Sequence, residues 1–161
     1  MKQYVWLMDR VSIACAVFAS ALLAAAALLI TWMVLYRAMG YSTYWEIELS
    51  VYMMVGSMFL ASPYTLMTKG HVSVDLLEHY LPGSARKALL ATLAVVSLLI
   101  CGWLAWATFE FALHAYTTGE RSESAWSPLK WPLFMTMPIG FGLTALQYIA
   151  ELARPESPEA A

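Results

Sequence analysis

The sequence predicts an all-α integral membrane protein with four long, tilted transmembrane helices and a short interfacial amphipathic helix between the second and third. The first indication is composition: of the 161 residues, 61% are hydrophobic and 12% are charged. Soluble domains average about 45–50% apolar and about 25% charged residues. The second indication is that the apolar residues form four stretches long enough to cross a hydrocarbon core of about 30 Å. We therefore expect one membrane domain, residues 1–161, with spans at about 11–36, 45–67, 86–117 and 131–150.

The first span has no charged residue between Arg10 and Arg37. As a helix, residues 11–36 would measure about 39 Å, so the span must tilt or protrude from the hydrocarbon. Its alanine-rich middle allows another helix to approach closely. The apolar stretch is too long for a secretory h-region, and no small-residue cleavage site follows it. We therefore expect an uncleaved span.

The second span opens on two glutamates. Thr43-x-x-Glu46 is a capping-box pattern, and Glu46 and Glu48 lie in the first turns, where the helix dipole favours carboxylates. We expect one of the two glutamates to act only as a cap. The other would pair either with Arg37 across the short loop or with a partner chain.

The longest polar interruption lies between the second and third spans. Lys69 and Gly70 end the second helix with a cation and a glycine, as is common at helix C-termini. Apolar residues then recur at helical spacing, which predicts a short helix over about 73–81 lying in the membrane interface.

Histidines are possible haem or metal ligands, and the sequence has three, His71, His79 and His114. His71 and His79 fall on the opposite side of the membrane from His114, so an axial pair would be about 30 Å apart by helix rise. Glu110 and His114 share one helix face, but about 33 Å of helix separates Glu110 from the start of the span. That position is at the far edge of the hydrocarbon, so a buried proton relay is not expected.

The fourth span begins at Trp131. Pro138, followed by Gly140 and Gly142, predicts a kink or a close helix contact. The proline-containing tail, residues 152–161, is expected to be flexible.

Orientation follows from counting basic residues on alternate sides of the membrane. Arg37, Arg121 and Lys130 lie on one side. The other side, which holds both termini and the central loop, has twice as many: Lys2, Arg10, Lys69, Arg86, Lys87 and Arg154. The positive-inside rule therefore predicts cytoplasmic N- and C-termini.

Several classes of function are excluded by what the sequence lacks. It has no nucleotide-binding loop, metal cluster or nucleophile motif, so we expect neither an enzyme nor a cofactor. A net charge of −2 without a basic run gives no reason to invoke nucleic acid. None of the spans has a charge at its centre, where ion and substrate pathways are usually marked. The chain is therefore expected to be a subunit. The alternatives are a membrane anchor of a redox complex and a small self-sufficient four-span exporter.

The motifs resemble the small membrane subunit of tripartite ATP-independent periplasmic (TRAP) transporters. The most specific match is Lys69-Gly70-His71-Val72-Ser73-Val74-Asp75, which is similar to the family's Gly-x-His-Ile/Val-x-Val-Asp signature. Two features depart from the pattern: Ala38 follows the arginine where an aromatic residue is common, and prolines flank Trp131. The matching positions, which we take as candidate interface or structural residues, are Arg37, Glu46, Glu48, Lys69, Gly70, His71, Asp75, Arg86, Arg121, Ser124, Trp131, Pro138 and Gly140.

The resemblance implies a bacterial inner-membrane protein that pairs with a large, elevator-type permease. A periplasmic solute-binding protein would deliver an organic acid, and a sodium gradient would drive uptake. The small subunit would be a scaffold that widens and anchors the static part, with phospholipids at the subunit interface. The charged residues of the outer loops, Arg37, Glu120, Arg121 and Glu123, would contact the solute-binding protein.

Overall fold

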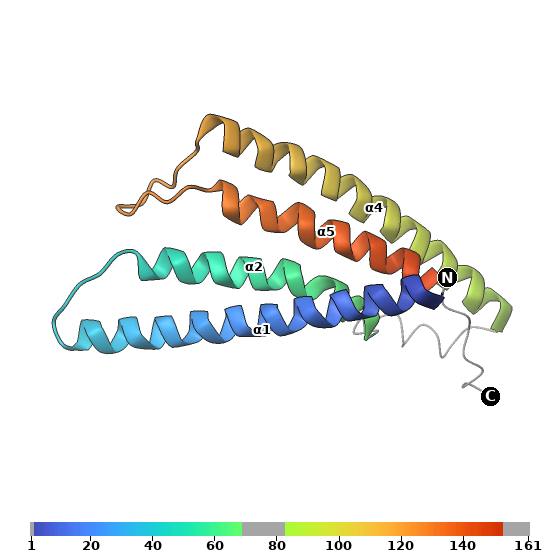
Figure 1. Cartoon of the computed structure of the whole chain (residues 1–161), viewed down its shortest axis with the longest axis horizontal. Helices are drawn as coiled ribbons and strands as arrows, with labels where there is room; N and C mark the ends of the chain where they lie inside the picture. Colours follow the sequence, from blue (N-terminus) through green and yellow to red (C-terminus); the bar gives the residue numbers. More distant parts are fainter. Residues whose placement is uncertain (1, 69–82, 153–161) are drawn as a thin grey trace.

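The computed structural model describes residues 2–68 and 83–152, which form four long helices (Figure 1). All four are long and apolar enough to cross a membrane, which confirms this part of the predicted fold class. The predicted interfacial helix at 73–81 and the predicted tail from residue 153 lie outside the described residues. The helices are α1 (Lys2–Ala38), α2 (Glu46–Met67), α4 (Gly83–Thr118) and α5 (Trp131–Leu152).

The predicted start of the first span near residue 11 is not the start of the helix, because α1 begins at Lys2. The span is predicted to follow Arg10, but a charged residue limits the apolar stretch rather than the helix. Tyr4 and Ser12, on either side of Arg10, both hydrogen-bond to α5. This first part of α1 therefore packs against α5 through polar contacts.

The helices lie in a row in the order α1, α2, α5, α4 (Figure 1). α1 packs against α2 and α4 against α5, so the chain forms two helical hairpins joined along the α2–α5 interface. We call the end that holds residues 39–45 and 119–130 the loop end. The opposite end, which holds the start of α1 and the end of α5, is the terminal end. There α1 also contacts α5.

The helices fall into two length classes. α1 and α4 have 37 and 36 residues, which corresponds to about 55 Å of helix. α2 and α5 have 22 residues each, about 33 Å, which matches the hydrocarbon core without much tilt. The two outer helices of the row must therefore tilt or extend beyond the hydrocarbon.

Small residues fill the helix contacts, and large apolar residues point outward. Five of the seven buried hydrophobic residues among those described are alanines. Large side chains stay exposed along the outer helices, for example Leu28 at 72% and Trp103 at 70%. In the most apolar 18-residue stretch of α4, no residue is buried within the chain. Such a surface requires lipid or another membrane protein around it.

Candidate functional site

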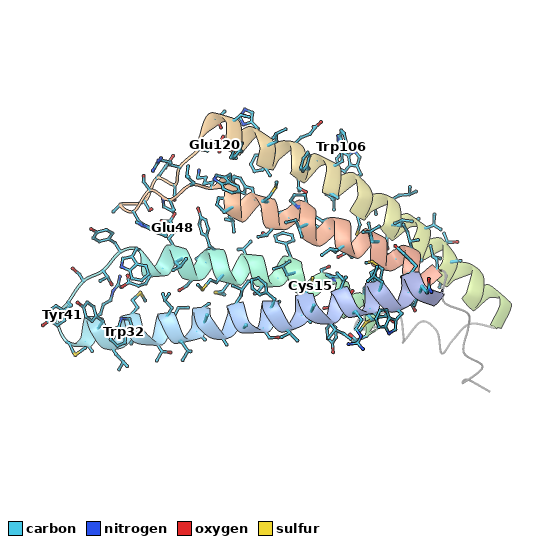
Figure 2. The ribbon with its side chains drawn as sticks, viewed as in Figure 1. Cys15, Trp32, Tyr41, Glu48, Trp106 and Glu120 are labelled. Atoms are coloured by element: carbon cyan, nitrogen blue, oxygen red, sulfur yellow. The ribbon has the colours of Figure 1, made fainter. Side chains whose placement is uncertain are left out.

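A first polar cluster joins α2 to the loop before α5 at the loop end. The Ser124 hydroxyl donates a hydrogen bond to the Glu48 carboxylate, which Figure 2 places at the start of α2, beside this loop. One turn further along α2, the Tyr52 hydroxyl donates to the Leu129 carbonyl at 3.3 Å. The Trp45 and Trp126 rings meet edge-on, with their centroids 6.4 Å apart. We call Trp45, Glu48, Tyr52, Ser124, Trp126 and Leu129 the loop-end cluster.

The loop that this cluster holds has a defined shape of its own. Arg121 and Leu129 form an antiparallel β-bridge, which closes residues 119–130 into a hairpin. Ser127 has a φ of +50°, a left-handed conformation that is uncommon outside glycine. Its hydroxyl donates to the Ser122 carbonyl at 3.0 Å and supports the turn from inside. The loop therefore presents its charged side chains from a fixed backbone.

The predicted capping box does not form. The residue before α2 is Trp45, which makes no side-chain capping hydrogen bond. The Thr43 hydroxyl is buried without a hydrogen-bond partner, and so is Oε2 of Glu46, whose side chain is 1% exposed. The positive end of the α2 dipole remains a favourable interaction for this carboxylate.

Of the two predicted alternatives for the second glutamate, the pairing with Arg37 does not form, and the pairing with a partner chain stays a prediction. The Arg37 guanidinium donates to the Thr43 carbonyl at 3.4 Å, across its own loop. The Glu48 carboxylate instead accepts a hydrogen bond from the Ser124 hydroxyl. Local sequence patterns pointed to contacts within one loop, whereas the contact that forms joins two segments far apart in the chain.

A second polar cluster, formed by Asp9, Ser12 and Gln147, joins α1 to α5 at the terminal end. The Ser12 hydroxyl donates to Oε1 of Gln147 at 3.1 Å, and Nε2 of Gln147 donates to the Asp9 carboxylate at 3.2 Å. Ser12 and Gln147 are both 0% exposed. Nearby, the Tyr4 hydroxyl donates to the Leu146 carbonyl at 3.1 Å. We call Asp9, Ser12 and Gln147 the terminal-end cluster.

Sequence reasoning missed the terminal-end cluster because it searched the spans for charges. Gln147 is uncharged, yet it is a strongly polar side chain in an apolar span, and such residues usually bond across helices. Asp9 and Ser12 are three residues apart and so share a helix face. These two signals together would have indicated a polar helix contact.

The middle of the α2–α5 interface is a close helix crossing at Gly140. A Cβ at Gly140 would lie 2.6 Å from the Phe59 carbonyl oxygen and 2.8 Å from the Phe59 Cβ. One turn away, the Thr144 hydroxyl donates to the Ser62 hydroxyl at 2.9 Å. The close contact predicted from Pro138 and the glycines is therefore confirmed at Gly140. A Cβ at Gly142 would meet nothing within 4 Å.

The remaining candidate residues do not converge on one site. Glu110 and His114 are exposed, and the nearest carboxylate recorded for the His114 Nδ1 is Glu120, at 3.6 Å. Trp131 opens α5 and packs edge-on against Tyr116 with ring centroids 5.5 Å apart. Lys69, Gly70, His71 and Asp75 lie outside the described residues, as does the side chain of Arg86.

In residues 2–68 and 83–152, no group of three histidine, cysteine, aspartate or glutamate side chains is placed to hold a metal ion. The polar groups described above join helices to each other or to loops. Fold and site together thus define a small, four-span membrane protein whose recorded polar contacts hold its own helices in place.

The chain belongs to the DctQ component family of tripartite ATP-independent periplasmic transporters, whose family model matches residues 26–156, about four-fifths of the sequence. A search of curated proteins found no match. Membership makes the chain the small membrane subunit of a TRAP transporter, a multi-pass inner-membrane protein and not an enzyme. It also implies two partner components, a large membrane permease and a periplasmic binding protein.

Proposed function

We propose that the chain is a static scaffold that supports an elevator-type permease during sodium-driven uptake of an organic acid. In this proposal the periplasmic binding protein delivers the acid, and the large permease carries it across the membrane. The small subunit widens the immobile part of the complex and anchors it in the bilayer, with phospholipids filling gaps at the subunit interface.

One observation carries this proposal: the polar groups hold the helices together, while the large apolar side chains point outward. Gln147 and Ser12 are fully buried, whereas Leu28 and Trp103 are at least 70% exposed. A subunit that carried solute would need polar groups along a pathway through the membrane. A scaffold needs a rigid helix layer and a wide apolar surface, which packing and lipid can cover.

The loop end is proposed to face the periplasm and the terminal end the cytoplasm. The support is the excess of basic residues flanking the terminal end, six against three. Alkaline phosphatase fused after Leu129 should be active, and the same enzyme fused after Leu152 should be inactive. The reverse pattern would invert the topology without affecting the scaffold role.

The charged residues of the loop end are proposed to meet the periplasmic binding protein. Arg37 and Arg121 are both exposed there, and Glu123 lies exposed in the same hairpin as Arg121. Reversal of these charges should slow uptake. If the contact is direct, the loss should persist at high salt, whereas a loss caused by weaker long-range steering should be large only at low salt.

The scaffold role is tested by reconstitution into liposomes with a sodium gradient and the loaded binding protein. The chain alone should give no uptake, and an affinity tag on it should recover the large permease from solubilised membranes. The complete system should take up an organic acid only when the sodium gradient is present. Uptake by the isolated chain, or failure to recover the permease, would overturn the proposal.

A further inference from the structure

A groove runs between α1 and α2 in the half of the membrane nearest the terminal end. It is lined by four residues of α1 and one of α2, namely Ile13, Ala16, Val17, Ser20 and Tyr64. Val17 is 66% exposed, so the groove opens away from the helix contacts. From Arg10 to Ser20 the helix rises about 15 Å, which is half of a hydrocarbon core of about 30 Å. The groove therefore reaches through one leaflet of the bilayer.

The floor of this groove is apolar. Its single α1 hydroxyl, that of Ser20, donates to the Ala16 carbonyl at 2.8 Å, so its hydrogen bond is made within α1. The other α1 side chains that line the groove are those of alanine, isoleucine and valine. Tyr64 lies in the last turn of α2, at the depth where tyrosine side chains commonly meet the headgroup region. A hydrocarbon chain suits such a floor.

A cation lies at the terminal-end mouth of the groove. Trp6, Arg10, Ile13, Val17 and Ser20 are spaced alternately by four and three residues, so they share one face of α1. The Arg10 guanidinium carbon lies 5.2 Å from the centroid of the Trp6 ring. Because helical side chains lean toward the N-terminus of their helix, this guanidinium is directed toward the terminal end, just beyond the groove. Both side chains are exposed.

The charge of Arg10 is available to a ligand. Within residues 2–68 and 83–152, the partner recorded for its guanidinium is the Trp6 ring, and no ion pair with a carboxylate is present. The neighbouring Asp9 is directed toward α5, where its carboxylate accepts a hydrogen bond from Nε2 of Gln147 at 3.2 Å. The N–H groups of the guanidinium are therefore free to donate at the edge of the hydrocarbon.

A cation above an apolar groove one leaflet deep matches the chemistry of a phospholipid. Arginine binds phosphate through two parallel hydrogen bonds, and a phospholipid carries its phosphate at the membrane surface with the acyl chains below it. An anionic headgroup is favoured over a zwitterionic one, because a zwitterionic headgroup brings its own ammonium group to the phosphate. Basic residues at the membrane edge attract anionic lipids for the same electrostatic reason.

We propose that the groove between α1 and α2 binds one anionic phospholipid of the leaflet at the terminal end. Arg10 holds the phosphate beside the Trp6 ring, and one acyl chain lies along α1 from Ile13 to Ser20, next to Tyr64. The site is formed by this chain alone. It therefore depends neither on the scaffold role nor on lipids that fill gaps at the subunit interface.

Native mass spectrometry of the purified full chain measures the affinity for the first bound lipid. The wild type should bind phosphatidylglycerol more tightly than phosphatidylcholine with the same acyl chains. Arg10→Gln should weaken binding of phosphatidylglycerol about fivefold, the effect of one basic residue on an anionic headgroup, and should remove the preference. Arg37→Gln is the matched control, since it removes the same charge at the other end of α1, and should leave this affinity unchanged.

Filling the groove gives a reading that does not depend on charge. Ser20→Leu places a larger side chain on the floor and should weaken the binding of both lipids. Ala14→Leu adds a similar side chain to an exposed position of α1 that does not line the groove. This control should bind both lipids as the wild type does.

The occupant of the groove in the intact complex is identified by photolabelling. Phosphatidylglycerol with a diazirine in one acyl chain is added to membranes that hold the complex. After illumination, peptide mass spectrometry should place the adduct within residues 13–20 or on Tyr64. Labelling of the permease or of other residues of this chain without these positions would mean that a protein helix covers the groove.

That labelling pattern would overturn the lipid site. Equal affinity of the wild type for the two lipids, unchanged binding in Arg10→Gln, or equal binding by the Ser20→Leu and Ala14→Leu variants would overturn it as well. None of these results bears on uptake by the complete system or on recovery of the permease, so the scaffold proposal would stand.

Discussion

The Glu48 carboxylate accepts a hydrogen bond from the Ser124 hydroxyl, although 76 residues separate them in the chain. This contact fastens the hairpin of residues 119–130 to the first turn of α2. Glu48 thus holds the α2–α5 interface near its loop end, and the crossing at Gly140 holds its middle. At the terminal end, the hydrogen bond between Ser12 and Gln147 joins α1 to α5. The two helical hairpins are therefore joined at the loop end, in the middle and at the terminal end.

Loss of the Glu48 carboxylate should loosen the hairpin. In Glu48→Ala, trypsin should cleave after Arg121 about fivefold faster than in the wild type, because one hydrogen bond of about 1 kcal/mol no longer holds the loop. Digestion of purified protein followed by mass spectrometry measures the rate. Glu123→Ala, an exposed change in the same loop, should cleave at the wild-type rate. Equal rates for Glu48→Ala and wild type would show that the contact contributes nothing to the order of the loop.

The terminal-end cluster should contribute measurably to the stability of the fold. Gln147→Leu has nearly the same volume but removes the hydrogen bond accepted from Ser12 and the one donated to Asp9. We therefore expect a loss of about 1–2 kcal/mol in the free energy of unfolding. Unfolding in mixed micelles of increasing denaturing detergent, followed by circular dichroism, gives the value. Leu146→Ala is the control, because that side chain is exposed and its backbone carbonyl still accepts from Tyr4. A Gln147→Leu variant as stable as wild type would contradict this assignment.

The spans were predictable from the sequence because their cause is local. An apolar stretch of 20 residues or more has few alternatives to crossing a membrane. The start of α1 was not predictable in the same way, since Asp9 and Arg10 end the apolar stretch but leave the helix intact. What keeps that turn helical is its contact with α5, which depends on the order of the helices in the row.

Which polar residues bond to each other also depends on the order of the helices in the row, and this order is not visible in the local sequence. Glu48 and Ser124 were both among the candidate residues, yet nothing near either of them indicates that they meet. Thr43 and Glu46 match a capping pattern, but the three-residue spacing alone does not ensure that the cap forms. Gly140 was predictable because a glycine beside a proline in a span indicates a close contact whichever helix supplies it.

The glycine–histidine–aspartate signature between α2 and α4 remains a prediction from the family resemblance. His71→Ala or Asp75→Ala should weaken assembly with the permease, or uptake, because the signature lies in the segment that connects the two helical hairpins. Substrate binding to the isolated periplasmic component should be unaffected, which fluorescence titration can check. His79→Ala, outside the signature, is the matched control. If both signature variants assemble and transport at wild-type levels, the segment is only a connection.

Two glycines one half-turn apart in α5 give the sharpest test of the α2–α5 interface. In Gly140→Ala the new methyl group would lie 2.6 Å from the Phe59 carbonyl oxygen, so α5 must move away from the α2 backbone. Overpacking of this kind costs about 1–3 kcal/mol. Gly142→Ala meets nothing within 4 Å and should be neutral or stabilising by up to about 1 kcal/mol, because alanine favours the helix. Detergent-unfolding midpoints of the two variants should therefore shift in opposite directions or differ clearly in size. Equal shifts would mean that α5 does not cross α2 at Gly140, and the helix row would have to be arranged differently.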